Sequence, residues 1–480
     1  MKMTMRGVIA GSAAWERKTR MRGRFLAILV ALSLPAAGQM TVSYPDGRVA
    51  STQVATPALS NELRPVKNLA EVGIADPFPI IKADELVQKA MYAGAYPGCR
   101  VLAAKDGKIF YDKAFGRTSY DPQSTVNLNT VYDLASLTKV VSTTLAVMRL
   151  YEQGKISLDK TLGDYLSVTA GTDKAAIPLR ALLLHQAGLK AWIPFYRSFY
   201  DSTGNLSDTV FQKTPDAVFN IEVAKDLYFR KDYRDTIWQT ILRSPLENAG
   251  RSVYSDLDFY FLAAVVERVT GKPIHRYVAE QFYTPMGLKM IGYLPLQFIR
   301  KELIAPTESD VSFRHQVLQG YVHDPGAALF GGVAGHAGVF GTAGDVAAIF
   351  QMLLNDGKYA GKSFFKPETI RYFTAYSSPI SRRGLGFDKP APDKFDAGPT
   401  DARCSGSTFG HQGFTGTCAW ADPENGVVFV FLSNRVYPSA ENNTINKTSI
   451  RTTVQGALYE ALGIPDNTSR KDLRDQQLRK

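Results

Sequence analysis

The feature that most constrains this chain is a mainly apolar segment from Ser136 to Tyr151 that contains no Gly or Pro. Gly154 stands shortly after it. This pattern predicts a buried helix that ends at a glycine. Lys139 is three positions after Ser136, and residues three apart lie on one face of a helix. The two side chains should therefore lie side by side in the first turn.

A serine beside a lysine indicates nucleophilic chemistry, because a serine hydroxyl needs an adjacent base. An amine in an apolar wall near other cations has a lowered pKa and can be that base, and the start of a helix adds positive potential where an oxyanion would form. The same spacing recurs as Ser157–Lys160 in a predicted turn and as Ser363–Lys366 in a loop. Only Ser136 leads into an apolar helix, which favours it, although so short a pattern can arise by chance.

Residues 1–38 have the organisation of a secretory signal peptide. Basic residues precede the apolar run Phe25–Leu34, and Ala36–Gly38 supplies small residues for cleavage. A retained anchor is the alternative, but the run is short for a bilayer, and no Cys follows to carry a lipid. Met21 is an alternative start. We expect a periplasmic or secreted protein with no stable membrane span after cleavage.

Charge and cysteine content exclude some classes of protein. The net charge is +11, and the predicted signal segment, with seven Lys or Arg and one Glu, contributes six of it, which leaves +5. That charge is mild and no basic stripe with interleaved aromatics appears, so no nucleic-acid partner is expected. Three cysteines cannot form a complete disulfide framework. Cys404 could pair with Cys418, but spacing alone does not show the geometry.

Strand-like runs lie near both ends of the chain, with helical patterns between them. The expected strands are 99–104, 108–115, 408–412, 417–422 and 427–432, and further expected helices are 84–91, 177–188, 256–270, 342–354 and 449–462. This order predicts an α+β fold, in which one antiparallel sheet built from both chain ends is flanked by helices and carries an inserted, mainly helical region.

We divide the chain into one main domain, 79–464, and flanking segments. Residues 39–78 are polar, contain Pro and lack a period, which predicts an extended linker. Residues 190–250 are rich in aromatic and charged side chains, and we interpret them as a lid-like insertion. Residues 465–480 carry mixed charge and should form a solvated tail.

Two further segments could complete a site with Ser136. Tyr254-Ser-Asp256 precedes a predicted helix, where Asp256 could simply be an N-cap and Tyr254 a packing residue. In Phe409–Thr417, glycines follow His411 on a predicted strand, and such glycines let a backbone N–H approach a ligand closely. The alternative for that segment is a plain bend with an exposed histidine.

Together, Ser136-x-x-Lys139, Tyr254-x-Asp256 and His411-x-Gly413 resemble the motifs of the serine β-lactamase and penicillin-binding-protein family in order and spacing. The resemblance is to the branch related to class C β-lactamases, which includes esterases and D-aminopeptidases. It covers about residues 80–462, and its supporting segments are Pro97–Leu102, Leu182–Leu189, Gly335–Phe340 and Phe431–Arg435.

The resemblance implies an acyl-enzyme mechanism. Ser136 would attack a carbonyl carbon, and Lys139 and the phenol of Tyr254 would share its proton and pass it to the leaving group. The backbone N–H groups of Ser136 and Phe414 would form the oxyanion hole. The positions that the resemblance assigns to substrate binding are Asp256, His411 and Gly413. No cofactor is implied.

This chain departs from the family's lactamases at two positions. They usually carry Asn where Asp256 stands, and an ionised acid cannot donate a hydrogen bond. They carry a fixed cation where this chain has His411, which is mostly neutral at pH 7. We therefore predict a secreted serine hydrolase acting on a small ester or a cell-wall peptide, such as a peptidoglycan fragment. The alternatives are a β-lactamase and a catalytically weak penicillin- or muropeptide-binding protein.

The other motifs carry little chemistry. Gly357–Ser363 has one residue too few between its glycines for a phosphate loop. The single histidines outside the motifs are better explained as structural than as metal ligands, so no metal site is predicted. His336, within the glycine-rich segment Gly331–Gly341, could line the cleft.

Overall fold

The computed structural model describes residues 40–43, 49–52, 62–247, 250–393, 398–466 and 470–479. The predicted signal peptide lies outside the described residues. Contacts divide the chain into two units, Met1–Ala58 and Leu59–Lys480. In the first unit, β1 (Met40–Ser43) pairs antiparallel with β2 (Val49–Thr52). Within the described ranges, no helix has the length and apolarity needed to cross a membrane.

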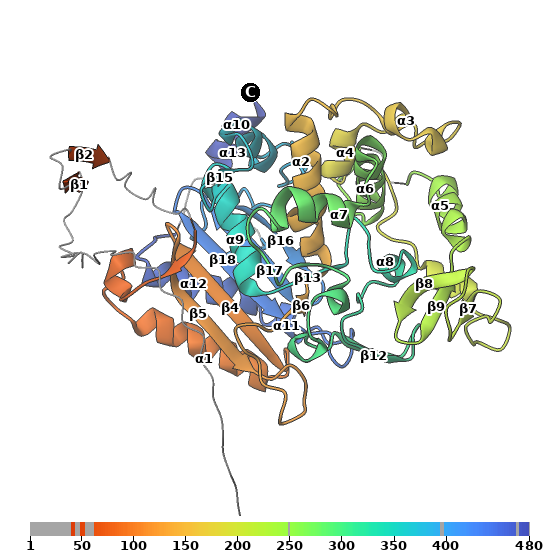
Figure 1. Cartoon of the computed structure of the whole chain (residues 1–480), viewed down its shortest axis with the longest axis horizontal. Coiled ribbons are helices and arrows are strands. Elements are labelled where there is room, and N and C mark those ends of the chain that lie inside the picture. The colour runs from red at the N-terminus through yellow and green to blue at the C-terminus, as the bar shows by residue number, and fades with distance from the viewer. Residues whose placement is uncertain are drawn as a thin grey trace, which may run out of the picture. The chain divides into compact units, whose positions relative to one another are not determined.

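A six-stranded sheet forms the centre of the larger unit (Figure 1). In spatial order its strands are β16 (Phe409–Gly413), β17 (Thr417–Asp422), β18 (Val427–Ser433), β4 (Gly98–Lys105), β5 (Lys108–Gly116) and β3 (Arg64–Pro65). Strands β4 and β18 pair antiparallel in the middle, with Leu102 opposite Val430. The early and late parts of the chain thus meet in one sheet, which confirms the predicted α+β fold.

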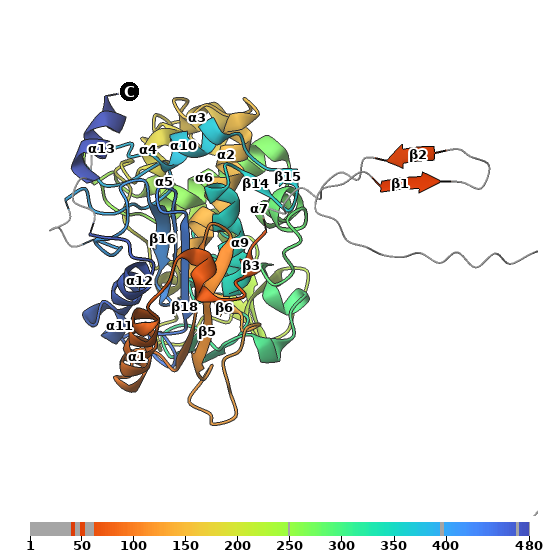
Figure 2. The same cartoon turned by 90° about the vertical axis from the view of Figure 1, so that its left-hand side faces the viewer.

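Helices cover both faces of this sheet (Figure 2). Helices α1 (Phe78–Tyr92) and α12 (Ile450–Ala461) lie on one face, and α9 (Ala343–Leu354) lies on the other. In β18, Phe429 and Phe431 belong to the core beneath α1 and α12, whereas Val428 and Val430 belong to the core that includes α9. Because side chains of a strand alternate between faces, the continuous apolar run of β18 reflects burial on both.

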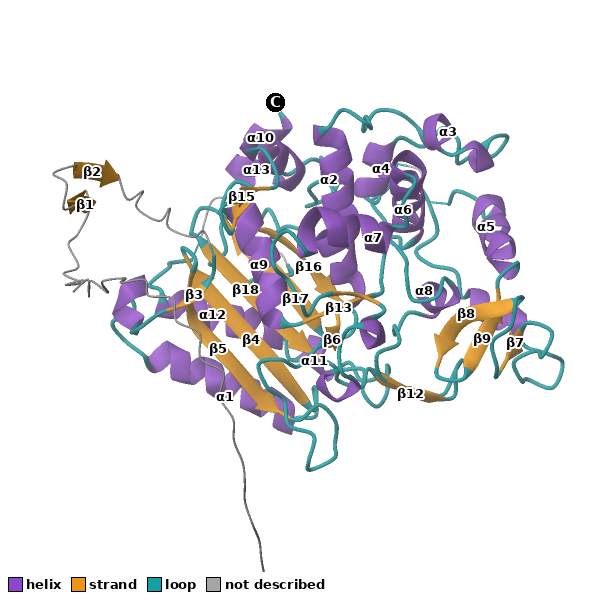
Figure 3. Cartoon of the chain, viewed as in Figure 1, coloured by secondary structure: helices purple, strands orange, loops and turns teal. Residues whose placement is uncertain are grey.

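Between β5 and β16 the chain forms the predicted, mainly helical region (Figure 3). Besides α9, its helices are α2 (Thr144–Glu152), α3 (Leu162–Tyr165), α4 (Leu179–Leu183), α5 (Tyr233–Arg243), α6 (Leu257–Thr270), α7 (Ile274–Val278), α8 (Pro325–Leu329) and α10 (Pro367–Thr374). Its short strands are β6 (Tyr132–Asp133), β7 (Phe211–Gln212), β8 (Phe219–Ala224), β9 (Leu227–Arg230), β10 (Gly292–Tyr293), β11 (Glu308–Asp310), β12 (Gln316–Leu318), β13 (Val339–Gly341), β14 (Lys358–Tyr359) and β15 (Lys362–Ser363). After β18 come α11 (Thr444–Lys447), α12 and α13 (Arg470–Leu478).

The helix predicted from Ser136 consists of three successive segments of different helix type. A 3₁₀ turn covers Ala135–Leu137, a π-helical turn covers Lys139–Thr143, and α2 follows. Gly154, with φ at 67°, stands just beyond its end as expected. π turns within helices are frequent at functional sites, and this one begins at the predicted lysine.

The insertion 190–250 contains more strand than expected. Strands β7, β9 and β8 form a small sheet at the edge of the molecule (Figure 3). Rings of Phe199, Phe211 and Phe229 pack together beneath it, with centroids 5.3 to 6.2 Å apart. This aromatic cluster explains the unusual composition of the segment, whereas a lid action over the serine stays a prediction.

Two flanking segments belong to the packed unit, contrary to expectation. In the predicted linker 39–78, β3 pairs in parallel with β5. In the predicted solvated tail 465–480, α13 begins at Arg470, which is 3% exposed and donates to the carbonyl groups of Asp401, Ala402 and Cys404. These contacts use backbone pairing and one arginine rather than a periodic apolar face, so composition did not reveal them.

The three cysteines are separate from one another. Cys99, Cys404 and Cys418 are all buried free thiols. The disulfide that the sequence left open between Cys404 and Cys418 is therefore not formed in this structure.

Candidate active site

Ser136 is presented by a strained and well-supported turn. Ala135, directly before it, has φ at 46°, a left-handed conformation that is unfavourable for a residue with a side chain. The buried carboxylate of Asp133 accepts a hydrogen bond from the Ala135 N–H at 2.9 Å and another from the His323 N–H at 2.6 Å. These two bonds hold the turn and fix the direction of Ser136.

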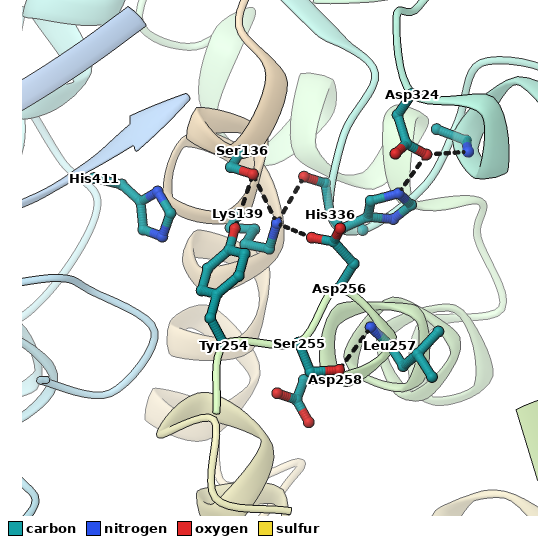
Figure 4. Close-up of polar contacts among 12 residues, drawn as sticks. Ser136, Lys139, Tyr254, Ser255, Asp256, Leu257, Asp258, Asp324, His336 and His411 are labelled. Carbon is teal, nitrogen blue, oxygen red and sulfur yellow. Dashed lines mark hydrogen bonds and ion pairs between the residues drawn. The ribbon is translucent and has the colours of Figure 1, made fainter. Parts of the chain in front are cut away.

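The three residues predicted as catalytic meet at the Ser136 hydroxyl (Figure 4). Nζ of Lys139 lies 3.0 Å from Oγ of Ser136, and the phenol of Tyr254 donates to the same Oγ at 2.8 Å. Tyr254 comes from the segment before α6, far away in sequence. The geometry gives one hydroxyl two proton-exchanging neighbours, which is the arrangement that an activated serine requires.

Lys139 is fully buried, yet its protonated form is more stable than the sequence indicated. Its Nζ also donates to Oδ1 of Asp256 at 2.7 Å and to the carbonyl oxygen of His336 at 3.2 Å. Burial alone would lower the pKa of Lys139, but the neighbouring Asp256 and Tyr254 raise it above its ordinary value. The expected lowering of this pKa is therefore wrong, because an acid contacts the amine inside the apolar wall.

Tyr254 is held in place by a buried histidine. The rings of Tyr254 and His185 pack with their centroids 4.6 Å apart, and Nδ1 of His185 lies 2.6 Å from a carboxylate oxygen of Asp258. Burial raises the pKa of the Tyr254 phenol, although Lys139 opposes the rise. Tyr254 is therefore a neutral phenol near pH 7, and His185 has the structural position expected of it.

A cleft of about 630 Å³ opens over Ser136. Its walls include Tyr254, Arg383, His411, Gly413 and Phe414. A Cβ on Gly413 would lie 2.6 Å from the carbonyl oxygen of Leu134, so only glycine lets the end of β16 approach the serine turn. This approach brings Phe414 to the cleft wall, whereas the predicted approach of a backbone N–H to a ligand stays a prediction. The oxyanion-hole role of the Phe414 N–H stays a prediction.

Arginines line the cleft as fixed cations, and the one beside Tyr254 and His411 is Arg383, which the sequence did not reveal. Burial and the charge of Arg383 lower the pKa of His411 to about 3, so the histidine is neutral as predicted. The Arg383 guanidinium lies 5.3 Å from the ring centroid of Tyr254, and its Nη1 is buried without a hydrogen-bond partner among the described residues. Arg383 follows Arg382 in an irregular loop, where no motif marks it.

Asp256 and His336 lie on the side of Lys139 away from this cleft. Asp256 contacts Lys139, and the buried ring of His336 places Nε2 2.7 Å from Oδ1 of Asp324. Both residues line a second, much smaller cavity with Asp324. The prediction that His336 lines the cleft of Ser136 is thus not met: its carbonyl group binds Lys139 and its ring points to Asp324.

Asp256, Asp324 and His336 are residue types that bind metal ions. Ligand atoms of Asp256, Asp324 and His336 lie within 4.8 Å of one another. The ammonium group of Lys139 already lies 2.7 Å from the Asp256 carboxylate, and a second cation there would be repelled. The cluster is better explained by its contacts with Lys139.

Comparisons with known proteins show what the chain as a whole is similar to. The sequence profile of the family described as Beta-lactamase matches residues 83–451. A protein of Escherichia coli O157:H7 named "Putative D-alanyl-D-alanine carboxypeptidase" is 33% identical over 380 residues, which span 73% of this chain and 81% of the relative.

Solved structures extend the comparison to the fold. A penicillin-binding-protein homologue from Caulobacter crescentus superposes with a TM-score of 0.57 at 20% identity, covering 80% of this chain and 98% of that one. EstCE1, described as a hydrolase with promiscuous acyltransferase activity, superposes with a TM-score of 0.56 at 21% identity over 80% and 100% of the two chains. At these identities the likeness concerns the fold alone.

Proposed function

This chain belongs to the Beta-lactamase family and is a serine hydrolase of that family, and from this premise we propose that it cleaves an ester or peptide bond through an acyl-enzyme on Ser136. The observation that carries the proposal is the position of the Ser136 hydroxyl, 3.0 Å from Nζ of Lys139 and 2.8 Å from the phenol of Tyr254. With two such neighbours, the serine can pass its proton to one group, and a proton can be supplied to the leaving group from the other.

The reaction would proceed in two halves. Oγ of Ser136 attacks the carbonyl carbon, and the N–H groups of Ser136 and Phe414 stabilise the oxyanion, each such donor being worth about 10²–10³ in rate. Tyr254 lines the same cleft as Ser136 and delivers a proton to the departing group. Water then attacks the acyl-enzyme and releases the acid.

The charge of the cleft supports a substrate with a carboxylate near the bond that is cleaved. The Arg383 side chain lines the wall beside Tyr254, with its guanidinium group 5.3 Å from the centre of the phenol ring, and guanidinium groups bind carboxylates strongly. A peptide that ends in D-alanine has such a group, and the relative from Escherichia coli O157:H7 bears the name "Putative D-alanyl-D-alanine carboxypeptidase". A β-lactam carries such a carboxylate too, so Arg383 does not separate the two substrate classes. We favour a short cell-wall peptide or small ester because of the name of this relative and because Asp256 stands where the family's lactamases usually carry Asn.

Steady-state kinetics with three substrates test the proposal. We expect hydrolysis of p-nitrophenyl acetate and of diacetyl-Lys-D-Ala-D-Ala, with much slower turnover of nitrocefin. Faster turnover of nitrocefin than of both other substrates would show a lactamase. A stable penicillin adduct without turnover of any substrate would show a binding protein instead.

We also propose that the protein is exported, because residues 1–38 have the organisation of a signal peptide. N-terminal sequencing of the protein from the cell envelope or medium should begin near Gln39. An exported protein that keeps Phe25–Leu34 would contradict cleavage.

A further inference from the structure

Lys139 lies between the reacting serine and a carboxylate outside the cleft (Figure 4). Its Nζ donates to Ser136 at 3.0 Å, to Asp256 at 2.7 Å and to the carbonyl oxygen of His336 at 3.2 Å. The Lys139 side chain is fully buried and that of Asp256 is 25% exposed. An ammonium group has three donors and no acceptor, so these three contacts match its full set of protons.

A fully protonated Lys139 cannot take the proton of Ser136 unless it passes one on. The contacts with Asp256 and Tyr254 hold the pKa of Lys139 above its ordinary value despite burial. Tyr254 does not replace it as the base, because burial raises the pKa of the phenol. The resting site therefore has an acid at each proton-exchanging position beside Ser136, and the proton must go to a further group.

We propose that Asp256 is the terminal proton acceptor of a Ser136–Lys139–Asp256 relay, an inference that rests on the acyl-enzyme function proposed above. Nζ of Lys139 first passes a proton to Oδ1 of Asp256, and the lone pair that this frees takes the Ser136 proton as the Oγ–carbon bond forms. Lys139 stays an ammonium group, Asp256 becomes a neutral carboxylic acid, and the substrate carbonyl oxygen gains the negative charge.

The second half of the step returns this proton. When the tetrahedral intermediate collapses, the bond to the leaving group breaks and Tyr254 donates its phenolic proton to that group. The proton on Asp256 then passes through Lys139 to the Tyr254 oxygen. Every proton is accounted for, and the carboxylate is restored for the hydrolysis of the acyl-enzyme.

The groups around the pair keep the relay in position. The ring of His336 is bound to Asp324 at 2.7 Å and stacks on Tyr260 with centroids 4.5 Å apart, which fixes the carbonyl group that Lys139 contacts. Asp258 is bound by His185 rather than by Lys139. The other charged or titratable groups that face the pair are Tyr254, Asp258 and His185 around the start of α6, and Arg383 and His411 from the cleft.

The relay is tested by the pH dependence of kcat/KM of the mature protein for p-nitrophenyl acetate, with Asp256→Asn as the variant. An amide accepts a hydrogen bond from Lys139 but does not take up a proton. We expect kcat/KM at pH 7 to fall about 10²-fold, the lower end of the range for a general acid–base group. The variant lacks the Asp256 charge that raises the pKa of Lys139, so its activity should recover below pH 10, as Lys139 loses its proton. Asp256→Glu, which keeps a carboxylate, should retain most of the activity at pH 7.

The matched control is Asp84→Asn, on the opposite face of the sheet. Asp84 is 24% exposed and pairs with Lys113 at 2.5 Å. Asp84→Asn therefore makes the same change of a lysine-paired carboxylate to an amide, and it should keep the wild-type pH profile of kcat/KM. The relay is wrong if Asp256→Asn has the wild-type kcat/KM and profile, or if its activity stays low up to pH 10. Labelling of the wild type by a fluorophosphonate shows independently whether the proposed function stands.

Discussion

The two sides of Lys139 present different charged groups. On the cleft side lie Ser136, Tyr254, His411 and Arg383, and on the other side lie Asp256, Asp324 and His336. The cleft side offers a guanidinium group and a neutral histidine, which suits an anionic substrate. The other side offers carboxylates, which suit a proton. The buried ammonium group of Lys139 lies between the substrate-binding side and the proton-accepting side. Substitutions can therefore change substrate binding and proton acceptance separately.

Removing the Ser136 hydroxyl should have the largest effect on hydrolysis. We expect Ser136→Ala to lower hydrolysis of p-nitrophenyl acetate by at least about 10⁴-fold, because no other group in the cleft forms the acyl-enzyme. Ser157→Ala and Ser363→Ala, which alter the other two Ser-x-x-Lys sequences, are the controls and should keep full activity. Initial rates measure both. Activity that survives Ser136→Ala would place the chemistry elsewhere.

Changing the cation on the cleft side should have a smaller, substrate-dependent effect. We expect Arg383→Ala to lower kcat/KM for diacetyl-Lys-D-Ala-D-Ala by about 10²-fold, since a charge-assisted hydrogen bond is worth about 1.5–3 kcal/mol. For p-nitrophenyl acetate, which has no carboxylate, the loss should be under about threefold. Equal losses for both substrates would mean that Arg383 positions Tyr254 rather than binding the carboxylate.

The neutral histidine of the cleft side should appear in the pH dependence of stability. With a folded pKa of about 3 for His411 and an unfolded value near 6.5, the unfolded chain binds the proton first as pH falls. This residue should therefore cost about 2 kcal/mol of unfolding free energy between pH 7 and pH 5. His411→Gln should lack that part of the decline in urea denaturation. An identical decline in the variant and the wild type would show that folding does not lower the pKa of His411.

Local patterns made much of this site predictable. Helical spacing predicted that Ser136 and Lys139 lie side by side. The glycines after His411 directed attention to Gly413. Of the three Ser-x-x-Lys sequences, the lysine is fully buried only at Lys139, whereas Lys160 and Lys366 are exposed. Burial, rather than the pattern, separates them, and the apolar run after Ser136 was the sequence signal for it.

Contacts between distant segments could not be predicted. Arg383 reaches Tyr254 from an irregular loop between α10 and β16, where no period or motif fixes its direction. Asp256 could be placed before a helix, but whether its carboxylate met substrate or Lys139 depended on a contact across 117 positions. The direction of the Lys139 pKa shift followed from that contact together with the one to Tyr254.

The most direct test of the central claim is the position of a covalent adduct. The mature protein is incubated with a fluorophosphonate, weighed intact and then digested for peptide mapping. We predict a single adduct on the peptide that contains Ser136, and no adduct after Ser136→Ala. An adduct on a different serine, or an unmodified protein that still hydrolyses p-nitrophenyl acetate, would contradict a Ser136 acyl-enzyme.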